Sequence, residues 1–251
     1  YKPDGIYTDG LTYPGDCTNE LHGCGYIDEN GERKPTQNIL SIRDAMKRIY
    51  RIMEQQGKKT YWVAHTSGSI TLPTLSLVDA YLDGEHLTGQ PRPFQLPLDM
   101  FRAEYMGHNF GIPALFLVYQ WNAGMTDKEG FAECMLHDTE LGWNLEYTTK
   151  AWKLWKDYRP EKAKFIPYWQ HGSFSAPNNV LVSQYVKPDG DCIVIAVNTG
   201  KEPVSGSLDI KADILAAKDA FNGTRTEVNC GQINDTFKPW EAKIYRVKIR
   251  K

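Results

Sequence analysis

Short apolar runs alternate with segments of helical periodicity through the first 160 residues. The run "GIYTDG" (5–10) is followed by a polar loop and then by "TQNILSIRDAMKRIYRIMEQQG" (36–57), whose apolar residues recur every three or four positions. We expect Thr36 to cap this helix and Gly57 to end it. Strands that alternate with helices in this way are typical of parallel βα units.

Four more strands and two more helices are predicted downstream. The strands are "KTYWVAH" (59–65), "LVDAYLD" (77–83), "IPALFLVYQW" (112–121) and "FAECML" (131–136). The helices are "LPLDMFRAEYMGHNFG" (96–111) and "EYTTKAWKLWKDY" (146–158). Five such strands predict an α/β fold, the C-terminal half of a (β/α)8 TIM barrel over residues 1–160. A doubly wound open sheet is the alternative, although no glycine-rich phosphate loop follows any strand.

Half a barrel would leave unpaired strand edges. The chain also begins inside a strand pattern, so we expect that Tyr1 is not the natural start. An upstream polypeptide segment is therefore predicted to complete the barrel.

The pattern changes after residue 160. The segment "NVLVSQYVKPDGDCIVIAVNTG" (179–200) contains two alternating strands around the turn "PDGD", which predicts a hairpin. Further short strands, separated by Gly and Asn turns, follow up to the C-terminal "AKIYRVKIRK". Residues 161–251 are predicted to form an all-β sandwich domain.

Charge and hydropathy narrow the range of partners. The 251 residues include 29 basic and 31 acidic side chains spread along the chain, for a formal net charge of -2. Binding to nucleic acid or to an anionic membrane surface is therefore disfavoured. No apolar run approaches the roughly 18 to 20 residues of a membrane span, and the first residues do not resemble a signal peptide.

The five cysteines do not form the framework of a small disulfide-rich domain. They are odd in number and scattered: Cys17, Cys24, Cys134, Cys192 and Cys230. Cys17 and Cys24 could pair, and His22 between them makes a metal site conceivable. Two thiols and one imidazole without a second cluster give weak support, so no metal is predicted.

Polar and aromatic side chains follow the predicted strands at the point where each strand ends. In a βα barrel these positions line one shared cavity. The side chains are Asp9, then His65, then Asp83, Glu85 and His86, then Gln120 and Trp121, and finally His137 and Asp138.

A pair of carboxylates among them suits hydrolysis of a glycosidic bond. That reaction needs a protonated carboxyl group beside the leaving oxygen and a carboxylate opposite it. We expect Asp9 to be the nucleophile or orienting acid and Glu85 the general acid/base, with Asp83 in reserve for either role. Asp9 before Gly10 and Asp83 before Gly84 could instead form turns.

Substrate contacts are predicted from aromatic rings and polar groups near the same ends. Flat aromatic faces stack on the apolar face of pyranose rings, and the two histidines of the group are equally suited to a buried structural role. The candidates are His22, Trp62, His65, Tyr119, Trp121, His137 and Asp138, with Tyr81 as a further ring.

Four stretches, "DGIYTDG", "HGCGYIDENGERKPT", "LDGEHL" and "KPWEAKIYRV", resemble relatives of glycoside hydrolase family 123. The resemblance implies a multidomain bacterial enzyme that hydrolyses polysaccharide or glycan chains in the periplasm or outside the cell, without a cofactor. Members of that family resemble substrate-assisted enzymes with adjacent Asp and Glu. Here Asp9 precedes Gly10, and Asp28 and Glu29 lie in a predicted turn. An Asp and a Glu two strands apart are instead similar to α-galactosidase barrels.

Two other functions remain open from the sequence. The same fold could serve a non-catalytic carbohydrate-binding protein, because a fold does not fix a function. A polysaccharide lyase that uses His65 or His137 as its base is the third possibility.

Overall fold

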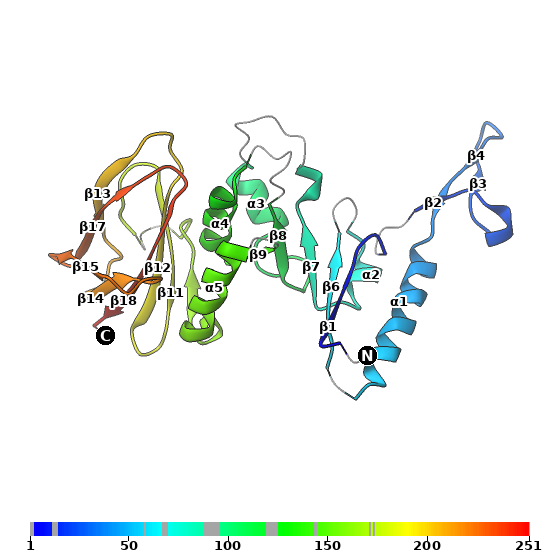
Figure 1. The fold of residues 1–251 in the computed structure, drawn as a ribbon. Helices are drawn as coiled ribbons and strands as arrows, with labels where there is room; N and C mark the ends of the chain where they lie inside the picture. Colours follow the sequence, from blue (N-terminus) through cyan, green and yellow to red (C-terminus); the bar gives the residue numbers. More distant parts are fainter. Residues whose placement is uncertain are drawn as a thin grey trace. The chain divides into compact units, whose positions relative to one another are not determined.

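The computed structural model describes residues 3–11, 15–57, 59–66, 70–87, 96–118, 125–142, 145–170, 172 and 174–250 (Figure 1). The chain divides into two compact units. Unit 1 comprises Tyr1–Leu87 and His108–Leu117, and unit 2 comprises Thr88–Gly107 and Val118–Lys251. None of the described helices has the length and apolarity needed to cross a bilayer.

Unit 1 is built on a parallel sheet, as the alternation of strands and helices predicts. Its strands pair in the order β1-β6-β7-β8, each parallel to its neighbour. They are β1 (Gly5–Thr8), β6 (Tyr61–His65), β7 (Ala80–Asp83) and β8 (Ala114–Leu117). Every residue of β7 is buried, as expected for an inner strand of a parallel sheet.

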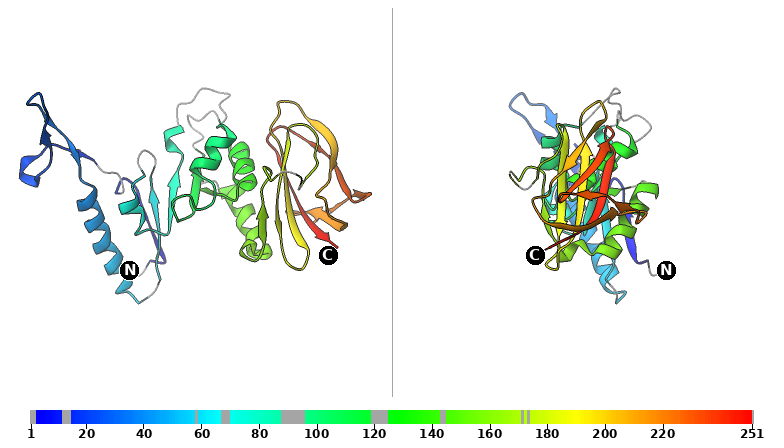
Figure 2. Two further views of the ribbon diagram at one scale, coloured as in Figure 1. Left: turned by 180° about the vertical axis from the view of Figure 1, so that it is seen from behind. Right: turned by 90° about the vertical axis from the view of Figure 1, so that its left-hand side faces the viewer.

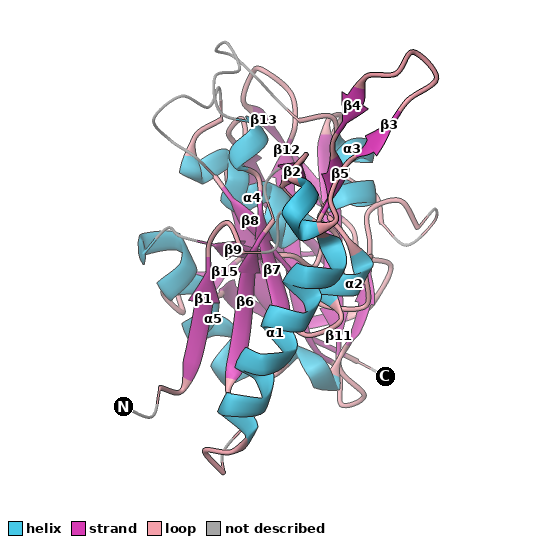
Figure 3. Ribbon diagram, turned by 90° about the vertical axis from the view of Figure 1, so that its right-hand side faces the viewer, coloured by secondary structure: helices cyan, strands magenta, loops and turns pink. Residues whose placement is uncertain are grey.

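Helix α1 (Ile39–Glu54) lies along one face of this sheet (Figure 3). Met46 and Met53 form one hydrophobic core with Trp62 of β6 and Tyr81 of β7. The helix begins at Ile39 after Asn38, whereas Thr36 lies in the short strand β5, so the expected cap was wrong. Unit 1 also contains two further short helices, α2 (Leu72–Leu75) and the 3-10 helix η2 (Glu85–Leu87).

Between β1 and α1 the chain makes a small extension of paired strands. Strand β2 (Asp16–Cys17) pairs with β5 (Thr36–Gln37), and inside them β3 (Tyr26–Ile27) pairs with β4 (Arg33–Lys34). A 3-10 helix, η1 (Glu20–His22), connects β2 to β3. The turn predicted at Asp28 and Glu29 is confirmed: it joins the paired strands β3 and β4, and the Asp28 carboxylate accepts hydrogen bonds from the amides of Asn30 and Glu32.

Unit 2 contains the remaining helices. They are α3 (Leu98–Glu104), α4 (Asp127–Leu136), α5 (Leu145–Tyr158) and the 3-10 helix η3 (Pro160–Lys162), with the short strand β9 (Glu140–Gly142) between α4 and α5.

The prediction of a strand at 131–136 was wrong, because these residues form the second half of α4. Thr126 and Glu129 make a reciprocal capping box that starts the helix. All residues from Gly130 to Leu136 are buried, so no polar face reveals the helical period.

Antiparallel strands form the rest of unit 2 (Figure 2). A six-stranded sheet has the order β10-β11-β12-β18-β14-β15, and a three-stranded sheet has the order β13-β17-β16. The strands are β10 (Lys164–Ile166), β11 (Val180–Val186), β12 (Asp191–Asn198), β13 (Val204–Leu208), β14 (Ile214–Asp219), β15 (Arg225–Thr226), β16 (Val228–Asn229), β17 (Gln232–Phe237) and β18 (Ala242–Ile249).

The two sheets share one hydrophobic core. Val194 of β12, Leu208 of β13, Phe237 of β17 and Val247 of β18 all belong to it and are fully buried. The hairpin predicted around "PDGD" is confirmed by the antiparallel pairing of β11 with β12. Because α4 and α5 belong to the same compact unit as these strands, a separate sandwich domain of residues 161–251 stays a prediction.

Gly84 meets a steric demand that only glycine satisfies. Its φ is 132°, and a Cβ there would lie 2.4 Å from the carbonyl oxygen of Leu117 in β8. We predict that Gly84→Ala destabilises unit 1 by about 3 kcal/mol, through strain and a backbone clash. Urea unfolding, followed by hydrogen exchange of peptides from β7 and β8, measures this loss.

Gly57→Ala is the matched control. Gly57 also has a positive φ, of 75°, but a Cβ added there would meet no atom within 4 Å. Its loss should be about 1 kcal/mol, from backbone strain alone. Equal losses for the two variants would contradict the proposed clash with Leu117.

Candidate functional site

Three predicted site residues meet at the carboxyl edge of the parallel sheet in unit 1. Asp9 follows β1, His65 is the last residue of β6, and Glu85 opens η2 just after β7. Parallel strands end at the same edge, so side chains far apart in sequence come together there.

The His65 imidazole contacts a carboxylate at each of its nitrogens. Nδ1 lies 3.3 Å from Asp9 Oδ1, and Nε2 lies 3.3 Å from Glu85 Oε2. The His65 side chain is 5% exposed, whereas those of Asp9 and Glu85 are 67% and 42% exposed. The buried His65 ring thus contacts two solvent-accessible carboxylates, one at each nitrogen.

This arrangement limits the distance between the two acids. The contacting oxygens can lie no further apart than two contacts of 3.3 Å plus the width of one imidazole ring. That limit falls within the range of roughly 5 to 9.5 Å that carboxylate pairs of retaining and inverting glycosidases cover.

Tyr7 is a site neighbour that the sequence reasoning missed. Its hydroxyl lies 2.8 Å from His65 Nδ1, and the ring is partly exposed. Side chains alternate along a strand, so Tyr7 and Asp9, two positions apart, share a face. That periodicity could have revealed Tyr7 from the sequence.

Asp83 has a different environment from Asp9 and Glu85. Its side chain is buried, and its Oδ1 accepts a hydrogen bond of 2.7 Å from the Gly84 amide and lies 3.3 Å from His86 Nδ1. The carboxylate is therefore engaged with its own loop and is poorly accessible to a ligand.

Trp62 and Tyr81 do not offer rings for stacking. Both are fully buried in the core beneath α1. The indole N–H of Trp62 donates to Thr8 Oγ1 at 2.9 Å, and its backbone amide donates to the Asp79 carboxylate at 2.8 Å. The expectation that Trp62 binds substrate is corrected by this burial, since alternation along β6 turns it into the core.

His137 and Asp138 belong to unit 2 and follow helix α4, not a strand. Nδ1–H of fully buried His137 donates to the Glu133 carbonyl at 2.7 Å, and Nε2 lies 3.2 Å from the Tyr168 hydroxyl. Asp138 accepts a hydrogen bond from the Tyr185 hydroxyl. The premise that a strand end presents these two residues was wrong. The contacts of His137 are those of a buried structural residue, whereas Asp138 is exposed.

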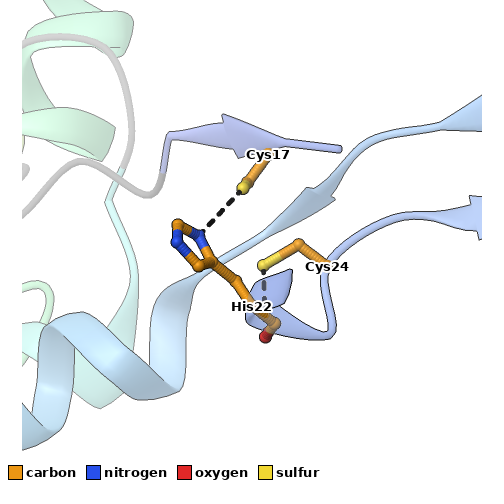
Figure 4. Close-up of side chains that lie close together, drawn as sticks. All are labelled: Cys17, His22 and Cys24. Atoms are coloured by element: carbon orange, nitrogen blue, oxygen red, sulfur yellow. Dashed lines mark hydrogen bonds between the residues drawn. The ribbon is translucent and has the colours of Figure 1, made fainter. Parts of the chain in front are cut away.

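The remaining candidates divide between the extension and an undescribed segment. Tyr119, Gln120 and Trp121 lie outside the described residues. His22 lies on the extension of unit 1 beside Cys17 and Cys24 (Figure 4).

The three side chains of the extension form a group that could hold a metal ion. Their ligand atoms all lie within 4.8 Å of one another. The pKa of the Cys17 thiol is lowered, first by a hydrogen bond from the Asn19 backbone and then by one from the His22 side chain. The pKa of the Cys24 thiol is raised, chiefly by its hydrogen bond with Cys17.

Comparison with known proteins connects this fold to glycoside hydrolases. No protein-family model matches the sequence, and no curated relative matches it. The structure is similar over 98% of the chain to a GH27 β-L-arabinopyranosidase from Geobacillus stearothermophilus, with a TM-score of 0.53 and 12% identity. A variant of that enzyme in complex with arabinose matches over 83% of the chain, with a TM-score of 0.51 and 13% identity.

A noncanonic maltogenic α-amylase from Thermotoga neapolitana is similar over 91% of this chain and 73% of its own, with a TM-score of 0.49 and 11% identity. The chain spans 57% of the arabinopyranosidase and 55% of its variant. At 12% and 13% identity the likeness to the arabinopyranosidase concerns the fold, a mixed α/β structure with a parallel sheet. The resemblance to family 123 stays a prediction.

The buried histidine of unit 2 makes stability depend on pH. Burial lowers the pKa of His137 from 6.5 to about 4, so the unfolded chain takes up a proton before the folded one does. We predict that unit 2 loses up to about 3 kcal/mol of stability as the pH falls from 6.5 to 4, and that this contribution is complete above pH 6.5. Urea unfolding at a series of pH values measures it.

His137→Gln should flatten this pH dependence, because it removes the titrating group. His108→Gln is the control, since His108 is exposed in unit 1. Identical pH profiles for the wild type and His137→Gln would contradict the assignment.

Proposed function

We propose that the chain carries part of the active site of a glycoside hydrolase that acts on a polysaccharide or glycan chain. One observation carries the proposal: two accessible carboxylates from separate strand ends, Asp9 and Glu85, contact opposite nitrogens of His65. The fold that the chain shares with glycoside hydrolases supports it.

Glu85 acts as the general acid/base in this proposal and Asp9 as the nucleophile or orienting carboxylate. Cleavage requires one acid to protonate the leaving oxygen while the other group attacks the anomeric carbon, activates water or stabilises the developing positive charge. Accessibility favours these two residues over Asp83, which is buried and bound to the Gly84 amide.

His65 is a positioning residue in this proposal. Its ring is anchored in the protein and contacts both acids, so it fixes the direction from which each carboxylate approaches a sugar. The partly exposed ring of Tyr7 next to it provides a surface suited to the apolar face of a pyranose.

The proposal includes two features beyond the chain. An upstream polypeptide segment would supply the other strands of a barrel, and the enzyme would act outside the cytoplasm. Because sugar subsites would then involve that segment, activity is best measured on the whole polypeptide as its source organism makes it.

We predict that Glu85→Gln lowers kcat on a cleavable glycan by about 10²–10⁴-fold and leaves KM within a few-fold, because proton transfer is lost and ground-state contacts are not. Release of reducing ends from a panel of glycans is the measurement. Glu54→Gln, a change of the same kind at an exposed position of α1, is the control with unchanged turnover.

Three outcomes would contradict the proposal. Unchanged turnover in Glu85→Gln would remove Glu85 from the mechanism. Glycan binding by calorimetry without release of reducing ends would indicate the non-catalytic carbohydrate-binding protein. An unsaturated product that absorbs in the ultraviolet would indicate a lyase.

A further inference from the structure

The extension of residues 15–37 has no hydrophobic core of its own. All of these residues are described, and none is buried. Its four strands have two residues each, and the apolar side chains of Leu21, Tyr26 and Ile27 are exposed. Two-residue pairings are marginal in water, and small units without a core are usually held by a disulfide or a metal.

Cys17, His22 and Cys24 converge inside this extension (Figure 4). Cys17 Sγ lies 3.8 Å from His22 Nδ1, and all three ligand atoms fall within 4.8 Å. In a tetrahedral zinc site, metal-ligand distances of about 2.0 to 2.3 Å separate neighbouring ligand atoms by roughly 3.3 to 3.8 Å. The side chains therefore need only small rotations to surround one ion.

One backbone carbonyl, that of Asn19, positions both His22 and Cys24. The carbonyl of Asn19 accepts hydrogen bonds from the amides of both His22 and Cys24, at 3.2 and 3.1 Å. The Asn19 side chain caps η1 by accepting from the Leu21 amide. This turn presents both ligands without any help from a core.

Glycines on both sides of Cys24 make the turn possible. Gly23 and Gly25 have φ values of 68° and 81°. A Cβ on Gly25 would lie 2.9 Å from the Lys34 carbonyl oxygen, so the ligand turn packs directly on β4. The Gly25 amide also donates to Thr36 Oγ1 of β5, which links the turn to the strand paired with Cys17.

We propose that Cys17, His22 and Cys24 bind one zinc ion that staples the extension of unit 1. Two thiolates and one imidazole are a donor set that favours zinc over magnesium or calcium, which prefer oxygen. Solvent can supply the fourth ligand, because His22 is exposed. The site is independent of the carboxylates proposed for catalysis.

A disulfide between Cys17 and Cys24 is the alternative crosslink for the extension. It would leave the imidazole without a role, although His22 faces Cys17 directly. Metal content and thiol reactivity distinguish the two crosslinks, since a disulfide blocks both thiols and holds no metal.

The test measures zinc in the whole protein. We expect one equivalent of zinc after purification without chelator, measured by elemental analysis. Replacement by Co²⁺ should give the thiolate charge-transfer band and the intense visible bands of a tetrahedral site. Chelation should make residues 15–37 more sensitive to proteases, because zinc binding contributes folding energy.

His22→Ala keeps both thiols and changes an exposed residue, so it separates ligand loss from misfolding. We expect it to weaken zinc binding at least tenfold. Cys230→Ser, at an exposed cysteine of unit 2, is the matched control and should bind zinc like the wild type. Absence of zinc and of the cobalt bands in the fully reduced protein would overturn the proposal, as would a Cys17–Cys24 disulfide in the protein as isolated.

Discussion

Parallel pairing of β1, β6 and β7 is the constraint on which the candidate site depends. It brings the end of β1 to the same edge as the ends of β6 and β7, which come more than fifty residues later, and Asp9, His65 and Glu85 meet there. A two-way contact supports the pairing of β6 with β7: the Asp79 carboxylate accepts from the Trp62 amide, and the Asp79 amide donates to the Trp62 carbonyl. The core beneath α1 then fixes which side chains of β6 face inward.

Two buried histidines show how partners decide what a side chain can do. His65 lies between carboxylates that reach solvent, so its environment connects the interior to a possible ligand. His137 is fully buried against a phenol and aromatic rings, and this burial favours its neutral form, although the hydrogen bond to the Glu133 carbonyl acts in the opposite direction. Both residues are buried histidines, but His65 contacts two carboxylates, whereas the hydrogen-bond partners of His137 are a carbonyl and a phenol.

The chain uses different means of holding its parts together. The sheets of unit 2 share a large apolar core, and unit 1 packs α1 against its parallel sheet. The extension of residues 15–37 has neither, so its order comes from local hydrogen bonds and ion pairs such as Arg33–Glu20, and from the zinc ion proposed for its thiols and imidazole. Domains too small to bury apolar surface are expected to need such a link.

The sequence by itself determined the local elements whose pattern has one interpretation. These were the amphipathic α1, the strands of unit 1 and the turn at "PDGD", where side-chain periodicity and turn residues agree. It also identified Asp9, His65 and Glu85 as polar groups at strand ends. It failed at 131–136, because a helix buried on every side has no polar face to mark its period.

Only the tertiary structure decided which candidates can act together. Burial removed Trp62, and engagement with the Gly84 amide set Asp83 apart from the accessible acids. The contact of His65 with two carboxylates depends on strand pairing and on the directions of side chains, neither of which a linear pattern encodes. The convergence of Cys17, His22 and Cys24 likewise follows from a turn around Asn19, a local fold that spacing alone left open.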